Sequence, residues 1–180
     1  MSEGPAPRLQ GERRPATEAE ARALASPTRL RILRLCLSEA LTNKDIAARL
    51  GRNPATVLHH VRTLVDTGFL VAGPVRRGTR GAREVPYRAT GKSWRMDGMG
   101  GPGATRDPAL AAFLQEVAAV GEEHLESTRL GLRLPPREVE EFRDRLQELL
   151  DEFAGRPMRQ DAPRWSVYIA MHPEEAPGDA

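Results

Sequence analysis

Two groups of polar and basic residues carry the side chains of this chain that could do chemistry. The first, residues 53–62, contains two adjacent histidines, His59 and His60, together with Thr56. The second, residues 75–83 (VRRGTRGAR), has four arginines punctuated by glycines. Side chains of these types donate hydrogen bonds to phosphate oxygens and to base edges. The two groups therefore point to contact with nucleic acid.

The first group falls on the second of two short predicted helices. Thr42, with Asp45 three residues later, is typical of a capping box at a helix start, and Gly51 ends that helix. The next helix starts at Asn53, with Pro54 at its first position, and its apolar residues recur at helical spacing. Two short helices joined at a glycine turn predict a helix-turn-helix whose second helix enters a DNA groove.

The second group lies at the tip of a predicted β-hairpin. An apolar run at 69–71 and a strand-like stretch at 85–89 flank the basic loop, and Gly78 and Gly81 permit it to turn. In such a wing the arginines lie beside flanking phosphates or enter the minor groove. The predicted DNA-binding residues are Thr42, Asn43, Asn53, Ala55, Thr56, Leu58, His59, His60, Arg62, Arg76, Arg77, Thr79, Arg80 and Arg83.

Three segments resemble the ArsR-type family of bacterial winged helix-turn-helix transcriptional regulators. They are ALASPTRLRILRLC at 23–36, DIAARLG at 45–51 and TVLHHVRTLVDTGFL at 56–70. The resemblance implies a homodimeric repressor whose paired recognition helices contact successive major grooves of a pseudo-palindromic operator. A dimer is also expected because one short helix and one wing offer too little contact for tight specific binding.

Metal-sensing members of that family place thiolate pairs at the start of the helix before the turn, or carboxylate and histidine ligands on a C-terminal helix. Residues 41–44 (LTNK), at the corresponding start, include no soft ligand. The one cysteine, Cys36, lies on an apolar helix face with Ile32 and Leu33, which favours a buried core thiol. His124 stands on a charged segment, where histidine is usually solvated. We predict no metal and no cofactor.

The formal net charge of +2 hides an uneven distribution. Residues 22–95 contain 15 Lys and Arg against 4 Asp and Glu, whereas residues 106–155 contain 6 against 12. We expect the basic half to meet DNA and the acidic half to face away. No stretch approaches the roughly 20 apolar residues of a membrane span, and no signal peptide is evident, so we expect a cytoplasmic protein.

Five segments are predicted. Residues 1–16 form a disordered arm, 17–95 the winged domain, 96–106 a glycine-rich linker, 107–173 a C-terminal dimerisation and candidate effector region, and 174–180 a disordered tail. The predicted fold class is mainly α with a small β-hairpin wing (α+β), completed by C-terminal dimerisation helices and a terminal strand.

The C-terminal region is predicted to contain two amphipathic helices, one beginning at Asp107 and Pro108 and one spanning 135–153. Their apolar stripes either form the core of a monomer or build a dimer interface, and we favour the interface. Alternation in 165–171 (WSVYIAM) predicts a half-buried strand that pairs within or between subunits. If an unknown small-molecule effector binds here, the residues that line its pocket are predicted to be Trp94, His124, Trp165 and Tyr168.

The sequence gives little support to catalysis. It contains no GxxxxGK[ST] phosphate loop, no GxSxG elbow and no HExxH pair. We therefore predict a sequence-specific DNA-binding regulator and not an enzyme, with double-stranded DNA and a second copy of the chain as partners. The alternative is a protein-interaction adaptor that uses a winged helix to dimerise, although an adaptor has no need for four arginines in its wing.

Overall fold

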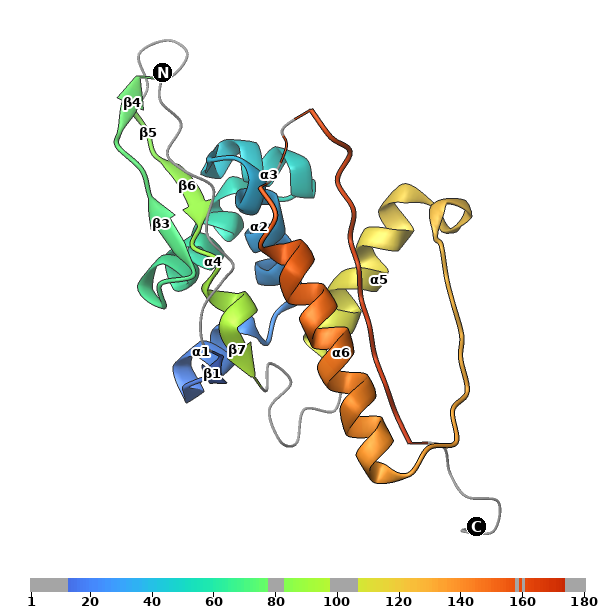
Figure 1. The fold of residues 1–180 in the computed structure, drawn as a ribbon. Coiled ribbons are helices and arrows are strands. Elements are labelled where there is room, and N and C mark those ends of the chain that lie inside the picture. Colours follow the sequence, from blue (N-terminus) through green and yellow to red (C-terminus); the bar gives the residue numbers. More distant parts are fainter. Residues whose placement is uncertain (1–12, 78–82, 98–106, 158, 160, 174–180) are drawn as a thin grey trace, which may run out of the picture.

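The first half of the chain folds into four helices from which a strand pair projects (Figure 1). The computed structural model describes residues 13–77, 83–97, 107–157, 159 and 161–173. The elements of this half are β1 (Arg14–Pro15), α1 (Glu18–Leu24), α2 (Pro27–Ser38), β2 (Leu41–Thr42), α3 (Asn43–Leu50), α4 (Pro54–Asp66), β3 (Leu70–Ala72), β4 (Arg76–Arg77), β5 (Arg83–Glu84), β6 (Pro86–Ala89), the 3₁₀ helix η2 (Lys92–Arg95) and β7 (Met96–Asp97). The second half contains α5 (Pro108–Val120), η3 (Glu122–His124) and α6 (Pro136–Ala154).

The helix-turn-helix begins and ends at the residues that local chemistry predicts. Thr42 caps α3 in a capping box with Asp45, and Gly51 ends the helix in the left-handed region at φ 61°. Asn53 then caps α4, with Pro54 at its first turn. The predicted helix-turn-helix is confirmed.

The core lies among α1 to α4 and the strands that follow them. Because the apolar residues of α2 and α4 recur at helical spacing, each helix turns one row of side chains inward. Burying each large apolar side chain contributes on the order of 1.5–3 kcal/mol. The largest fully buried side chains are Leu24, Ile32, Cys36, Ile46, Val57, Val61, Leu64 and Phe69.

The wing is an antiparallel hairpin, as predicted. At its root β6 lies between β2 and β3, with Leu70 opposite Ala89 and Leu41 opposite Tyr87. Farther out β4 pairs with β5. The root buries Leu70 and Ala89 against the helices, so the hairpin is anchored at one end and extends from the helical domain at the other.

The N-terminal boundary differs from the prediction. Residues 13–16 were expected in a disordered arm, yet β1 pairs in parallel with β7, with Arg14 opposite Met96. Two contacts order this segment. Arg14 donates two hydrogen bonds to the buried carboxylate of Glu20, and Arg13 donates to the carbonyl of Met96, 83 residues along the chain. The predicted linker likewise starts too early, since β7 occupies 96–97. The rest of the predicted arm and linker lies outside the described residues.

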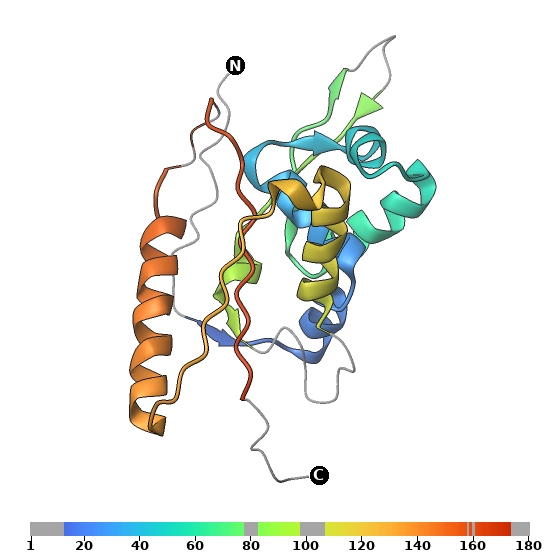
Figure 2. The same cartoon turned by 90° about the vertical axis from the view of Figure 1, so that its right-hand side faces the viewer.

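Both predicted C-terminal helices are present. Asp107 caps α5 through its carboxylate, which accepts the backbone N–H of Ala109. Pro108 and Ala112 of α5 are buried, and α5 contacts α2. α6 begins at Pro136 and buries none of its residues. In Figure 2, α6 stands apart from α5, and three large apolar side chains of α6, Phe142, Leu149 and Phe153, are exposed.

The predicted terminal strand is not formed. Residues 165–171 belong to no sheet of the described residues, and Trp165 is 71% exposed. They lie instead along α5, where Ser166 donates to Glu116 at 2.8 Å and Tyr168 donates to Asp107 at 2.8 Å. The partners of this segment are thus side chains of α5 and its N-cap, and not a strand. The predicted tail, 174–180, lies outside the described residues.

Candidate nucleic-acid interface

One face of α4 is exposed while the opposite face is buried. Val57, Val61 and Leu64 have no exposed surface and fix the rotation of the helix about its axis. That rotation leaves the predicted DNA-binding residues Ala55, Thr56, His59 and Arg62 exposed together, and we call these four the recognition face. Hydroxyl, imidazole and guanidinium groups presented in this way can bond base edges in a major groove.

Leu58 and His60 lie at the border of the buried face and are only partly exposed. The Nδ1 atom of His60 is buried and has no hydrogen-bond partner among the described residues. Burial, with the positive charges of Arg29 and Arg52 nearby, lowers the pKa of His60 below its ordinary 6.5. These effects favour the neutral form of the His60 imidazole.

Three predicted DNA-binding residues around the turn have structural partners. Thr42 is 4% exposed and its hydroxyl donates to Asp45 at 2.7 Å, so its side chain positions α3. Asn43 donates to the carbonyl of Pro54 at 2.9 Å, which joins the starts of α3 and α4. The Asn53 side chain accepts the N–H of Ala55 at 2.8 Å. Asn43 and Asn53 thus orient the recognition helix.

The wing places arginines opposite one another. Arg77 pairs in register with Arg83, and both are exposed. Like charges directly across a strand pair repel, so an anion between them would be stabilising. Arg76 instead lies opposite Glu84, with its Nε 3.8 Å from the carboxylate. Thr79 and Arg80, also predicted to bind DNA, lie outside the described residues.

Arg52 is a basic residue beside this interface that the sequence analysis did not single out. It is exposed in the turn between α3 and α4, and its charge acts on His60. A basic residue directly before a helix N-cap is well placed to contact phosphate. Its position directly before Asn53, the predicted start of the recognition helix, is the sequence feature that could have identified it as a phosphate contact.

The four predicted effector residues have separate surroundings. Trp94 donates to Asp151 of α6 at 3.0 Å, while Tyr168 stacks on Phe113 with ring centroids 5.5 Å apart. Trp165 and His124 are mostly exposed. A surface hollow near the end of α6 is lined by other residues, namely Arg156, Pro157, Arg159 and Ala162.

Cys36 is a buried core thiol, as predicted. It has no exposed surface, and burial raises its pKa to about 12. Such a thiol is neither a nucleophile nor a metal ligand at neutral pH.

In the part of the chain that the structure describes, no three His, Cys, Asp or Glu side chains gather to hold a metal ion. Nor is any described helix both long and apolar enough to cross a membrane.

Comparison with known proteins supports the helix-turn-helix assignment. A family model described as a helix-turn-helix domain matches residues 24–71, which span α2 to β3. This match overlaps all three segments that resemble ArsR-type regulators, and with the antiparallel hairpin that follows α4 the domain has the geometry of a winged helix-turn-helix. No curated protein matches the chain significantly.

Several solved structures share limited similarity with the chain. A homodimeric winged helix-turn-helix domain of Mb0332 from Mycobacterium bovis, a possible ArsR-family regulator, is 29% identical over 62% of this chain and 82% of its own, with a TM-score of 0.34. ZitR from Lactococcus lactis, in complex with DNA, is 20% identical over 84% and 86%, with a TM-score of 0.33. The adhesin competence repressor AdcR from Streptococcus pyogenes is 21% identical over 71% and 80%, with a TM-score of 0.32. Because TM-scores this low do not establish a shared overall fold, the winged domain is assigned from its own geometry and from the family match.

Proposed function

We propose that this winged helix-turn-helix protein is a homodimeric, sequence-specific transcriptional repressor that binds an inverted-repeat operator. The observation that carries the proposal is the recognition face of α4, held outward by a fully buried row on the same helix and followed directly by an arginine-bearing hairpin. In this assignment Thr56, His59 and Arg62 contact base edges. The arginines of the wing contact phosphates or the minor groove.

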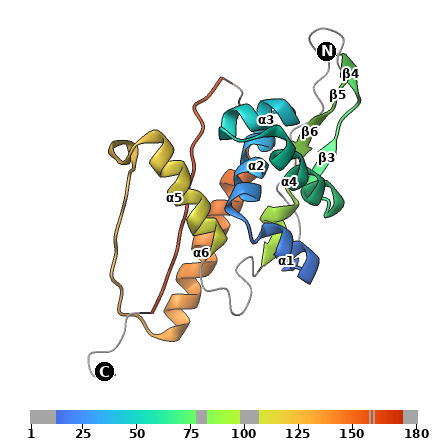
Figure 3. The same ribbon diagram turned by 180° about the vertical axis from the view of Figure 1, so that it is seen from behind.

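Charge supports this orientation on DNA. α6 carries seven Asp and Glu but only three Arg, whereas β3 to β6 and α4 lie in the basic half of the chain. Figure 3 shows α4 and the hairpin on one side of the molecule and α5 and α6 toward the other. DNA that approaches the hairpin side is thus attracted by the basic residues of α4 and the wing, while the acidic helix α6 lies away from it.

Exposed apolar surface supports the homodimer. Phe142, Leu149 and Phe153 repeat along one stripe of α6, and all three are exposed. None of the 19 residues of α6 is buried in the protomer. An amphipathic helix of this kind needs a partner that covers its apolar stripe. A second copy supplies the same stripe and also the second recognition helix that an inverted repeat requires.

A small-molecule effector would act through the contacts that join the C-terminal region to the winged domain. Glu39 accepts Arg49 of α3 and Arg164 of the C-terminal segment, both at 2.7 Å. A ligand that favours another arrangement of the C-terminal region would shift the spacing of the recognition helices and release DNA. If no metabolite alters operator affinity, the protein is a constitutive regulator.

The proposed function is tested by selecting genomic DNA fragments that bind the full-length protein, including DNA upstream of its own gene, at two salt concentrations. An enriched inverted repeat that survives the higher salt is the expected result. Weak binding that salt erases on every sequence would overturn the proposal. That outcome would favour the alternative, a winged-helix adaptor that dimerises without binding specific DNA.

A further inference from the structure

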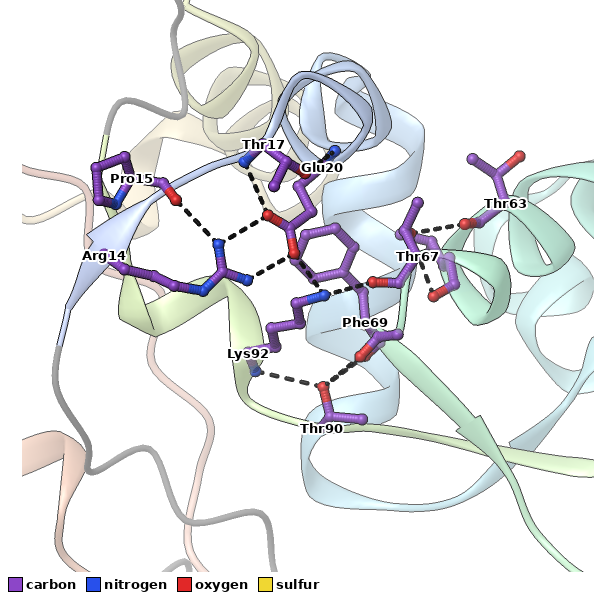
Figure 4. Close-up of polar contacts among 11 residues, drawn as sticks. Arg14, Pro15, Thr17, Glu20, Thr63, Thr67, Phe69, Thr90 and Lys92 are labelled. Carbon is purple, nitrogen blue, oxygen red and sulfur yellow. Dashed lines mark hydrogen bonds and ion pairs between the residues drawn. The ribbon is translucent and has the colours of Figure 1, made fainter.

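A nearly buried carboxylate, Glu20 of α1, lies at the centre of an ion cluster beneath the wing (Figure 4). Its side chain is 7% exposed and accepts two hydrogen bonds from Arg14, at 2.9 and 2.7 Å. The backbone N–H of Thr17 donates to it at 2.8 Å, and the ammonium group of Lys92 lies 2.6 Å away. One carboxylate thus holds the N-terminal segment and the residue that follows the wing.

The same ammonium group also contacts the end of the recognition helix. Lys92 Nζ donates to the carbonyl of Thr67, the C-cap of α4, at 2.7 Å, and it lies 5.1 Å from the ring centroid of Phe69. A cation at a helix C-terminus interacts favourably with the helix dipole. Thr90 strengthens this junction, because its hydroxyl donates to the carbonyl of Gly68 at 2.9 Å.

This junction lies where the two candidate DNA-binding elements meet. α4 ends at Asp66 and β3 begins at Leu70, so only a short turn separates the recognition helix from one strand of the wing. The other strand at the root, β6, ends at Ala89, shortly before Lys92. An ammonium group anchored on a carboxylate of α1 therefore fixes the end of α4 and the root of the wing against the same support.

We propose that Lys92 and Glu20 are positioning residues for DNA binding, which hold α4 and the wing in the relative orientation that lets both engage one duplex. The inference rests on the proposed function, and it assigns neither residue to contact with DNA. Because the pair is largely withdrawn from water, losing either partner removes a charged contact that water does not readily replace, and this disturbs the junction.

The test compares operator binding by the full-length protein and its K92M, E20Q and K92R variants, at a temperature where each is fully folded. We expect K92M and E20Q each to weaken operator binding about tenfold or more, with nonspecific affinity and salt dependence unchanged. K92R keeps a cation at the junction and should regain most of the loss. The matched control is R34M, which breaks the 3.2 Å ion pair of Arg34 with Glu116 between α2 and α5 and should change affinity less than about twofold.

Direct contact of Lys92 with phosphate predicts the opposite pattern. K92M would then reduce the salt slope by about one, and E20Q would leave binding unchanged or stronger because it releases the ammonium group. Either result would overturn the inference, as would equal losses in E20Q and R34M.

A second measurement does not depend on DNA. The amides of Gly68 and Phe69 donate to the carbonyls of Val65 and Leu64 at the end of α4. Their hydrogen exchange should accelerate in K92M while the amide of Val61, in the middle of the helix, keeps its protection. Unchanged exchange at Gly68 and Phe69 would overturn the inference. Accelerated exchange in a protein that selects no operator would instead mean that the proposed function fails while the junction stands.

Discussion

The winged domain and the C-terminal region differ in where they keep their apolar side chains. Among the described residues, every buried hydrophobic side chain except Ala112 lies between Ala23 and Met96. Of the fifteen large hydrophobic side chains that are exposed, thirteen lie after residue 107. The winged domain therefore has a core within one protomer. The C-terminal region has many large apolar side chains, but in the protomer they are mostly exposed. In the proposed homodimer the two regions would take their stability from different sources, the winged domain from its own packing and the C-terminal region from a second copy.

Removing the C-terminal region should have the largest effect. A chain that ends at residue 106 should remain folded in its winged domain, because that domain holds nearly all of the described core. It should be a monomer, and its operator affinity should fall on the order of a hundredfold or more, because one half-site then binds alone. Sedimentation and operator titration measure both effects. A truncated chain that still dimerises and binds with full affinity would break the comparison.

A pair of leucine substitutions tests the two sources of stability directly. L64A removes a fully buried side chain of α4 and should lower the free energy of unfolding by about 3 kcal/mol at every protein concentration. L149A truncates a side chain that is 51% exposed in the protomer, so it should weaken the dimer instead. Urea unfolding at two protein concentrations separates these effects. Equal, concentration-independent losses would place Leu149 in a monomer core.

Charge removal from the wing sharpens the comparison further. Replacing Arg76, Arg77 and Arg83 with Ala should weaken binding on all sequences and make the salt dependence shallower, by up to about 0.9 per lost phosphate contact. The control variant, R137A/R143A/R145A, removes the same charge from α6 and should leave the salt slope unchanged. If both variants lower the slope equally, the wing has no special role and the acidic region does not face away from DNA.

The smallest expected effect is at the link between the regions. Hydrogen bonds from Arg49 and Arg164 lower the pKa of Glu39 from 4.5 to about 2. Because the folded-state pKa is depressed, the link stabilises the protein above pH 4.5 and is lost as the pH falls toward 2. Glu39 is about one-third exposed, so solvent screening keeps the contribution below about 1 kcal/mol. E39Q should therefore cost stability near neutral pH and lose that cost in acid, as measured by urea unfolding across this pH range. A cost that does not vary with pH would exclude the ionised link.

The sequence was sufficient wherever a structure depends on neighbours along the chain. The capping box of Thr42 and Asp45, the proline after Asn53 and the buried row of α4 involve only residues within a few turns of each other. They predict where α3 and α4 begin and which face of α4 is exposed. Reasoning of the same kind placed the starts of α5 and α6, and the hairpin was predicted from its apolar flanks and glycines.

The failures involve partners distant in sequence. Glu20 is close to Arg14 in the sequence, but Lys92 and Met96, which complete the contacts of this segment, are not, and nothing near Arg14 indicates them. The alternation in 165–171 is real, but a strand needs an edge to pair with, and no residue pattern shows whether the protomer provides one.

The parallel pairing of β1 with β7 has a consequence for how the domain is made. Arg13 donates to the carbonyl of Met96 across a sequence separation of 83 residues, so this closing contact has a high contact order. During synthesis β1 leaves the ribosome first, but it cannot pair until residue 97 has followed. The N-terminal segment can therefore dock only after every other element of the winged domain has been synthesised.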